Sequence, residues 1–291
     1  MKKFIATSIA LVVIGGIAIA FSTYKVDAKS FKKNKSYNVE NIETLKVYTD
    51  SWDVRFKESN SNEVTISAEG KQKDKAPVTF QKGGEYLVIR QKAQKSSGFF
   101  GGFTFGKQGG TIYINVPKSG MNNIEITNKD GNIQMSKISA DNIVVENNYG
   151  DEKIKGVSAN TGKFASRDGS LSLENSSFEE LNITSTNGDN YMKDIDSSKI
   201  KVTSKDGAVS IRDITEGESL VVNTIAGDIG LSYKKAPTSL TVFAKSNSDV
   251  TFDLDGLKKS NDGVKLKKGE IGEGANKLSL SSVDGAINVT N

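Results

Sequence analysis

The sequence predicts an all-β protein: a parallel β-solenoid, single-stranded and β-helix-like, with coils of about 19 residues, placed after an N-terminal transmembrane helix. Three observations lead to this prediction. An apolar run stands near the N-terminus, apolar and polar residues alternate with period two from about residue 46 onward, and a turn glycine recurs in fixed register. No later stretch has the i, i+3, i+4, i+7 spacing of an amphipathic helix, so we expect few or no helices there.

The composition excludes several kinds of catalytic and metal chemistry. The 291 residues include no Cys and no His, and the formal net charge is +4. The chain therefore has no thiol nucleophile, no disulfide, no Cys/His zinc site and no histidine general base. We expect no metal, no cofactor and no nucleic-acid partner, because the chain is nearly neutral and has no nucleic-acid recognition module.

Residues 1–28 predict a membrane anchor or signal segment. An apolar run over residues 4–21 follows two lysines and is just long enough to span the hydrocarbon core. It is longer than the apolar region of a usual signal peptide, which favours an uncleaved anchor. Small-residue patterns at residues 18–20 and 26–28 leave cleavage and secretion as the alternative.

The charges around this segment bear on its orientation. Lysines that follow the run, most of them in a basic linker over residues 29–40, outnumber the two before it, which by the positive-inside rule would keep the domain in the cytoplasm. A short basic head before an apolar run is, however, the usual export signature. We expect a single-pass cell-membrane protein with its domain on the extracytoplasmic side.

Residues 41–120 predict an N-terminal β cap or subdomain that contains a hairpin rich in Phe and Gly. The hairpin tip has lysines nearby and four phenylalanines, namely Phe99, Phe100, Phe103 and Phe105. Aromatic residues beside lysines suit a membrane interface or a groove on a partner. The alternative is that the tip folds back over the open end of the solenoid as a cap.

Residues 121–252 contain the internal repeat. Each unit has two alternating apolar positions before a turn glycine and two after it, which predicts strand, tight turn, strand and corner. We expect the turn glycines to use positive φ, which glycine adopts without steric cost. The last of them follows a longer insertion that begins after Ser248 continues the register. The glycines are Gly131, Gly150, Gly169, Gly188, Gly207, Gly227 and Gly285.

Acidic residues flank these glycines, and stacked coils would bring them into a ladder. A ladder of carboxylates can bind calcium, and a close pair can cleave glycosides. Ordinary turn chemistry also explains them and is the interpretation we favour, because Asn, Ala and Ser replace Asp freely at these positions. The residues are Asp130, Asp151, Asp168, Asp189, Asp206 and Asp228.

Residues 253–291 predict an insertion rich in Lys and Gly, followed by a C-terminal coil. Its lysines suit an anionic wall polymer, and they equally suit a solvated strand edge that resists aggregation. The clustered lysines are Lys258, Lys259, Lys265, Lys267 and Lys268.

The anchor, the Trp52-Asp53-Val54 unit, the strand over residues 112–117 and the repeated Gly-Asp-Ile or Asp-Gly-x-Ile turns together resemble a bacterial family. The chain is similar to the putative-adhesin domain-of-unknown-function family, and most similar to the LiaG-type proteins of Gram-positive envelope-stress operons. The resemblance implies a membrane-tethered extracytoplasmic β-solenoid linked to envelope stress. It supplies no catalytic residues.

Three function classes follow. The first is a non-catalytic envelope protein that binds a partner protein or an envelope polymer, and we expect no enzyme activity. The second is a polysaccharide-active β-helix enzyme that uses turn carboxylates, although few long loops are present to build a substrate cleft. The third is a purely structural adhesin or spacer, for which a stiff solenoid is suited.

Overall fold

The computed structural model describes residues 29–72, 76–92 and 109–291. The predicted anchor over residues 4–21 and the four phenylalanines of the predicted hairpin tip lie outside these ranges. Within them, no helix combines the length and the apolar character needed to cross a membrane.

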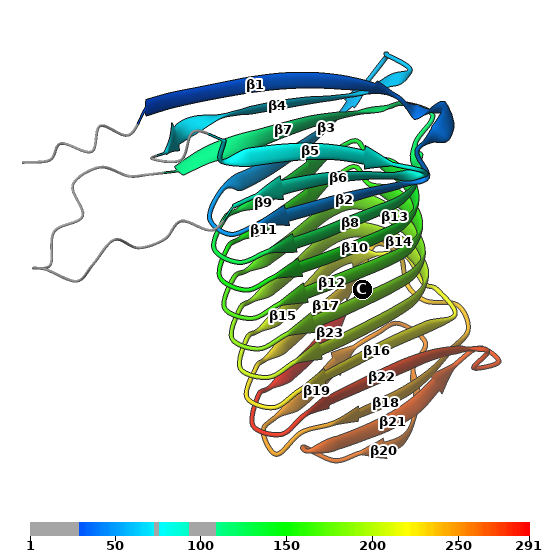
Figure 1. The fold of residues 1–291 in the computed structure, drawn as a ribbon. Coiled ribbons are helices and arrows are strands. Elements are labelled where there is room, and N and C mark those ends of the chain that lie inside the picture. The colour runs from blue at the N-terminus through cyan, green and yellow to red at the C-terminus, as the bar shows by residue number, and fades with distance from the viewer. Residues whose placement is uncertain (1–28, 73–75, 93–108) are drawn as a thin grey trace, which may run out of the picture.

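The described chain forms one 23-stranded sheet wound into a solenoid, with a single short 3-10 helix (Figure 1). The all-β prediction is therefore confirmed. In chain order the elements are β1 (Lys29–Asn38), η1 (Val39–Asn41), β2 (Thr44–Thr49), β3 (Asp53–Ser59), β4 (Glu63–Gln72), β5 (Val78–Gly83), β6 (Tyr86–Gln91), β7 (Gly109–Pro117), β8 (Met121–Asn128), β9 (Ile133–Ser136), β10 (Ser139–Asn147), β11 (Glu152–Lys155), β12 (Ser158–Ser166), β13 (Leu171–Ser185), β14 (Asn190–Ser204), β15 (Val209–Ile214), β16 (Ser219–Thr224), β17 (Ile229–Tyr233), β18 (Leu240–Lys245), β19 (Val250–Asp253), β20 (Lys258–Asp262), β21 (Leu266–Ile271), β22 (Asn276–Ser282) and β23 (Ile287–Thr290).

The regular coils build two walls around a continuous apolar core. The first wall stacks β8, β10, β12 and the C-terminal parts of β13 and β14 in parallel. The second wall stacks β9, β11, the N-terminal parts of β13 and β14, and β15. Neighbouring coils pair residues 19 apart, as Ile124 with Ile143, so like side chains form columns inside and outside.

Both ends of the solenoid are interleaved, so that spatial order departs from chain order. At the N-terminal end, β2 lies between β6 and β8, and β3 lies between β7 and β9. At the C-terminal end, β22 lies between β16 and β18, and β23 lies between β17 and β19 (Figure 1). The expected order, with Ser248 continuing from Gly227 and Gly285 closing the stack, is therefore wrong. Gly285 stacks directly on Gly227.

Antiparallel strands cover both ends. β5 pairs with β6, and β4 pairs with both β7 and β1. Residues 29–38, assigned to a basic linker from sequence, form β1, and its Phe31 packs edge-on against the buried Trp52 with ring centroids 6.2 Å apart. At the other end, β21 pairs with β18 and β20 with β21. The lysines Lys259 and Lys267 of that hairpin form ion pairs with Asp262.

Glu216 ties the two interleaved C-terminal coils together. Its carboxylate accepts hydrogen bonds from the Thr238 backbone (2.7 Å) and hydroxyl (3.1 Å), from the Ser239 backbone (3.1 Å) and from the Asn276 amide (3.1 Å). Partial burial acts to raise the pKa of Glu216, but these hydrogen bonds outweigh it and lower the pKa below its ordinary value. The carboxylate is therefore held ionised at the point where β18 and β22 begin.

The turn glycines are required by close stacking of the coils. A Cβ at any of the seven would lie 1.8–2.2 Å from a backbone carbonyl oxygen of the neighbouring coil. The prediction of positive φ is wrong, because none of them lies in the left-handed region. That conformation occurs at the opposite corner, at φ of 48–65°, in Lys137, Gly156, Asn175, Asp194 and Asp213.

A buried polar column serves the carbonyl groups of these glycines. At five of the seven glycines, the residue three positions earlier donates a side-chain hydrogen bond to the glycine oxygen, as in Ser166 to Gly169 and Thr224 to Gly227, both at 2.7 Å. The Asn190 amide serves the Gly188 oxygen, and the Ser246 hydroxyl serves the Gly285 oxygen. An unpaired buried carbonyl would cost about 1–3 kcal/mol. Its members are buried apart from Ser166, which is half-buried: Thr49, Asn128, Asn147, Ser166, Ser185, Ser204, Thr224, Ser246 and Ser282.

Glu152 is the one charged side chain buried among the described residues, at 1% exposure. It points inward from β11, and its stacked neighbours are Ile133 and Leu171. Neither carboxyl oxygen has a hydrogen-bond partner, and burial raises the pKa of Glu152 well above its ordinary value. The neutral, protonated carboxyl is the form that fits this position.

Replacing Gly188 by Ala tests the stacking requirement. The added methyl would lie 1.9 Å from the Gly169 oxygen, so we expect the free energy of unfolding to fall by about 1–3 kcal/mol. Gly230→Ala is the matched control, because the Cβ position of Gly230 on β17 has open space around it. Equal losses of stability in the two variants, measured by urea unfolding, would contradict the argument.

Replacing Glu152 by Leu should raise the free energy of unfolding at neutral pH by about 1–3 kcal/mol, because an unpartnered buried carboxyl is removed. The pKa is raised in the folded state, so stability from the bound proton is fully present below the ordinary value of 4.5 and is lost as pH rises through the folded value. The advantage of the variant should therefore grow with pH in urea titrations. Glu146→Leu, at an exposed position of β10, is the control and should show no such pH-dependent gain.

Candidate functional site

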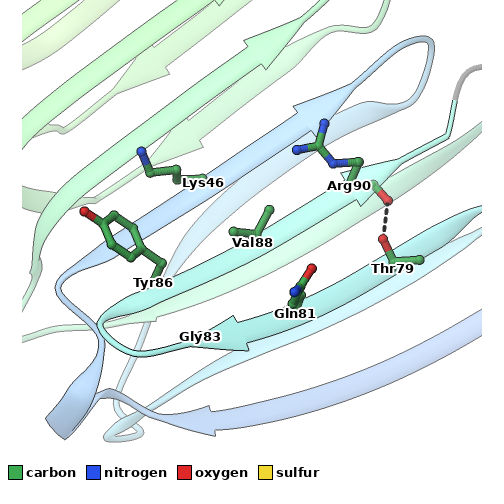
Figure 2. Close-up of a pocket in the computed structure, with 7 residues that line it drawn as sticks. All are labelled: Lys46, Thr79, Gln81, Gly83, Tyr86, Val88 and Arg90. Carbon is green, nitrogen blue, oxygen red and sulfur yellow. Dashed lines mark hydrogen bonds between the residues drawn. The ribbon is translucent and has the colours of Figure 1, made fainter.

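A groove of about 440 Å³ lies on the outer face of the solenoid near its N-terminal end. It runs across β2, β5 and β6, and Figure 2 shows Lys46 and Tyr86 at one end, Val88 in the middle and Arg90 at the other end. Its lining residues are Lys46, Thr79, Gln81, Gly83, Tyr86, Val88 and Arg90.

Strand alternation places these side chains outside. On β6, Leu87 and Ile89 are fully buried in the core, so Tyr86, Val88 and Arg90 face solvent. Register then sets the neighbours: β2 aligns Lys46 with Val88, and antiparallel β5 aligns Thr79 and Gln81 with Arg90 and Val88. The small side chain of Val88 and the absence of one at Gly83 leave the groove open between its longer neighbours.

Two cations of unlike character line the groove. The guanidinium of Arg90 lies 4.3 Å from the centroid of the Tyr48 ring and has no carboxylate partner among the described residues. The ammonium of Lys46 lies 5.0 Å from the centroid of the Tyr86 ring and 2.9 Å from the Glu125 carboxylate. Its hydrogen bond to Glu125 raises the pKa of Lys46 above the ordinary value. Arg90 is therefore the cation available to an anion.

The arrangement suits binding of a polar chain. Tyr86 is 48% exposed and offers an aromatic face, Arg90 offers five fixed donors, and Gln81 and Thr79 add an amide and a hydroxyl. A sugar ring can lie on the aromatic face while its hydroxyls and any carboxylate meet these polar groups. The lining includes no carboxylate that could serve as a general acid or base.

The predicted turn acids lie at the tight turns, away from the groove. Those that follow the glycine position accept backbone hydrogen bonds from the neighbouring coil, as Asp151 does from Ser170 (3.1 Å) and Asp189 from Ala208 (2.9 Å). Asp228 accepts one from Ala286 (2.7 Å) in the same way. These carboxylates perform the local role expected of Asp in a turn.

The acids that precede a glycine lie beside neighbouring cations. Asp130, Asp168 and Asp206 approach Lys129, Arg167 and Lys205 at 3.6, 3.9 and 3.3 Å. No group of three or more acids in the described ranges is arranged to hold a metal ion. The hairpin-tip residues Phe99, Phe100, Phe103 and Phe105 lie outside the described residues, so their contact role stays a prediction.

Sequence reasoning missed the groove, the buried polar column and Glu152. The Ser, Thr or Asn three residues before each glycine was a visible signal, because it recurs with the same period as the glycine. The groove had no such signal. Its two halves, near Lys46 and near Arg90, come together only because β2 and β6 pair across an interleaved coil.

Comparison with known proteins places this architecture. Residues 42–290 match the family model described as Toastrack DUF4097. Among solved structures, a putative adhesin from Bacteroides fragilis superposes with a TM-score of 0.56 at 15% identity, covering 90% of this chain and 98% of that one. A putative adhesin from Parabacteroides distasonis gives 0.46 at 11% identity, covering 90% and 98%. No curated protein matches the sequence.

These likenesses differ in what they establish. At such low identity, the structural neighbour with the higher TM-score shows the fold alone. The family match extends from the residues before β2 to the end of β23 and thus spans both walls and both interleaved ends. The chain therefore belongs to the Toastrack DUF4097 family.

Proposed function

We propose that this chain is a non-catalytic, extracytoplasmic β-solenoid that binds an envelope polymer at the groove, with residues 4–21 as its membrane tether. The observation that carries the proposal is one open groove with the exposed Tyr86 ring at one end and the Arg90 guanidinium, which has no carboxylate partner among the described residues, at the other. Its ligand is a glycan chain that carries carboxylates, because it must offer both a ring face and an anion.

The position of the polar groups favours binding over catalysis. The interior is filled by apolar columns, and the buried Glu152 is flanked by apolar neighbours in its column. The turn carboxylates that would serve a polysaccharide-active enzyme are engaged by backbone amides or lie beside adjacent cations. A contact surface on a rigid support is what remains for function.

The cellular setting rests on the N-terminal segment and on relatives. The apolar run after two lysines supports export, and the solved neighbours described as adhesins support a surface location. The resemblance to LiaG-type proteins supports a role in the response to envelope stress. In this role the anchor would hold the groove at the extracytoplasmic surface of the cell membrane, within reach of envelope polymers.

Binding at the groove is tested by Tyr86→Ala and Arg90→Ala. We expect each to weaken binding of soluble peptidoglycan glycan strands by about tenfold, as for the central residues of a contact surface. Tyr149→Ala is the matched control, since Tyr149 is 49% exposed and lies beside Arg167, with 5.9 Å from guanidinium to ring centroid. Calorimetric titration that finds the same loss for Tyr149→Ala would sink the assignment.

The side of the membrane is tested with a single thiol, because the native chain has no cysteine. Lys201→Cys introduces one at an exposed position of β14. We expect a membrane-impermeant maleimide to label it in intact cells as fully as in lysed cells. Labelling that appears only after lysis would place the domain in the cytoplasm and overturn the extracytoplasmic assignment.

A further inference from the structure

A stripe of positive charge runs along the outer face of the second wall, separate from the groove on the first wall. Strand register puts its members in two adjacent columns from β3 to β15, through β9, β11, β13 and β14. This basic stripe comprises Arg55, Lys57, Lys153, Lys155, Lys193 and Arg212.

The stripe is long and narrow. One column aligns Arg55 with Gln134 and Lys153, and the other aligns Lys57 with Ser136 and Lys155. Alternate residues of a strand stand about 7 Å apart and neighbouring strands about 4.8 Å apart, so the stripe is about 7 Å wide and about 24 Å long. It follows the solenoid axis.

Within the two columns, cations outnumber carboxylates. The acids of the neighbouring column on the same face, Asp53, Asp151 and Asp189, accept backbone hydrogen bonds from the next coil. Glu174 is the one carboxylate within the two columns, where it lies 3.3 Å from Lys155. Lys193 lies 3.9 Å from Asp213 at the corner. The remaining four cations have no carboxylate partner among the described residues: Arg55, Lys57, Lys153 and Arg212.

Two tyrosines stand among the cations. The guanidinium of Arg55 lies 5.8 Å from the ring centroid of Tyr113, and that of Arg212 lies 5.9 Å from the ring centroid of Tyr191. Such contacts hold a guanidinium against the sheet at little cost to its hydrogen-bonding capacity. Tyr191 lies within the first column on β14, and Tyr113 on β7 lies next to Arg55 at the end of that column, so each hydroxyl adds a donor to this face.

The first wall has no comparable excess of cations. Over β8, β10, β12 and the C-terminal parts of β13 and β14, its outward carboxylates outnumber its lysines: Glu125, Asp141, Glu146, Glu179, Glu180 and Asp196 against Lys163, Lys199 and Lys201. The charge of the second wall is therefore a property of that face and does not follow from the net charge of +4 spread over the chain.

We propose that the basic stripe binds a phosphodiester-linked polymer of sugars or polyols, laid along the solenoid axis. Such a chain carries one permanent negative charge per unit. It matches a stripe of cations that is two side-chain columns, or about 7 Å, wide. A membrane surface fits less well, because none of the exposed large apolar side chains in the described ranges lies in the two columns. This goes beyond the glycan groove, which is on the other wall.

The test uses the full chain and a fluorescently labelled synthetic poly(glycerol phosphate), followed by anisotropy at increasing salt. We expect Lys153→Glu/Lys155→Glu to weaken binding by about tenfold or more and to flatten the salt dependence. Lys199→Glu/Lys201→Glu is the matched control, because it reverses the charge of two lysines with the same spacing on the other wall. In each pair one lysine has a glutamate nearby: Lys199 lies 3.4 Å from Glu218, and Lys155 lies 3.3 Å from Glu174. The control variant should bind as the wild type does.

Each other outcome overturns the proposal. These outcomes are absence of binding by the wild type, equal loss in both double variants, equal binding of poly-glutamate, and binding of phosphatidylglycerol vesicles in place of the polymer. Lys153→Gln/Lys155→Gln, which adds no new charge, repeats the comparison if charge reversal disturbs the fold. The groove variant Arg90→Ala should bind poly(glycerol phosphate) as the wild type does. The proposals for the groove and for the basic stripe are therefore tested independently of each other.

Discussion

The structure depends on how closely successive coils approach at the tight turn. There the carbonyl oxygen of one turn residue occupies the place where the next coil would carry a Cβ, so each of seven stacked positions is glycine. At five of these turns, a Ser, Thr or Asn three residues earlier donates a side-chain hydrogen bond to the glycine oxygen. Glycine permits the close approach of the coils, and the polar side chains supply hydrogen bonds to the carbonyl groups that this approach brings together.

Stacking at a fixed interval also determines how surface chemistry is organised. Because each outward position repeats one coil later, a side chain acquires neighbours that are 19 residues away in sequence and one strand away in space. Charges of one sign can then accumulate along the axis, as from Arg55 to Arg212 on the second wall. On the first wall, pairing of β2 with β8 sets Lys46 beside Glu125, while Arg90 has no carboxylate partner among the described residues.

The sequence predicted what repeats and could not predict what happens once. The spacing of the turn glycines predicted the all-β class and the coil length, because any side chain at that position would clash with the backbone of the neighbouring coil. The reason predicted for these glycines, a positive φ, was wrong. Left-handed backbone lies at the opposite corner of the coil, where residues other than glycine, such as Lys137 and Asp213, adopt it. Interleaving was invisible, because pairing of β2 with β6 or of β22 with β16 depends on contacts between segments that do not share the repeat. The groove was invisible for the same reason.

The interleaved C-terminal end constrains the order in which the chain can fold. β18 and β19 are synthesised before β22 and β23, yet they lie one level farther from the centre. A ribosome therefore releases the outer coil while the level beneath it is still vacant, and simple addition of one coil after another cannot finish the stack. In the folded protein, β22 pairs with β16 on one side and with β18 on the other. Until β22 is in place, the backbone donors and acceptors on the facing edges of β16 and β18 have no strand to pair with. This end of the solenoid can therefore form its full set of strand pairs only after β22 and β23 have been synthesised.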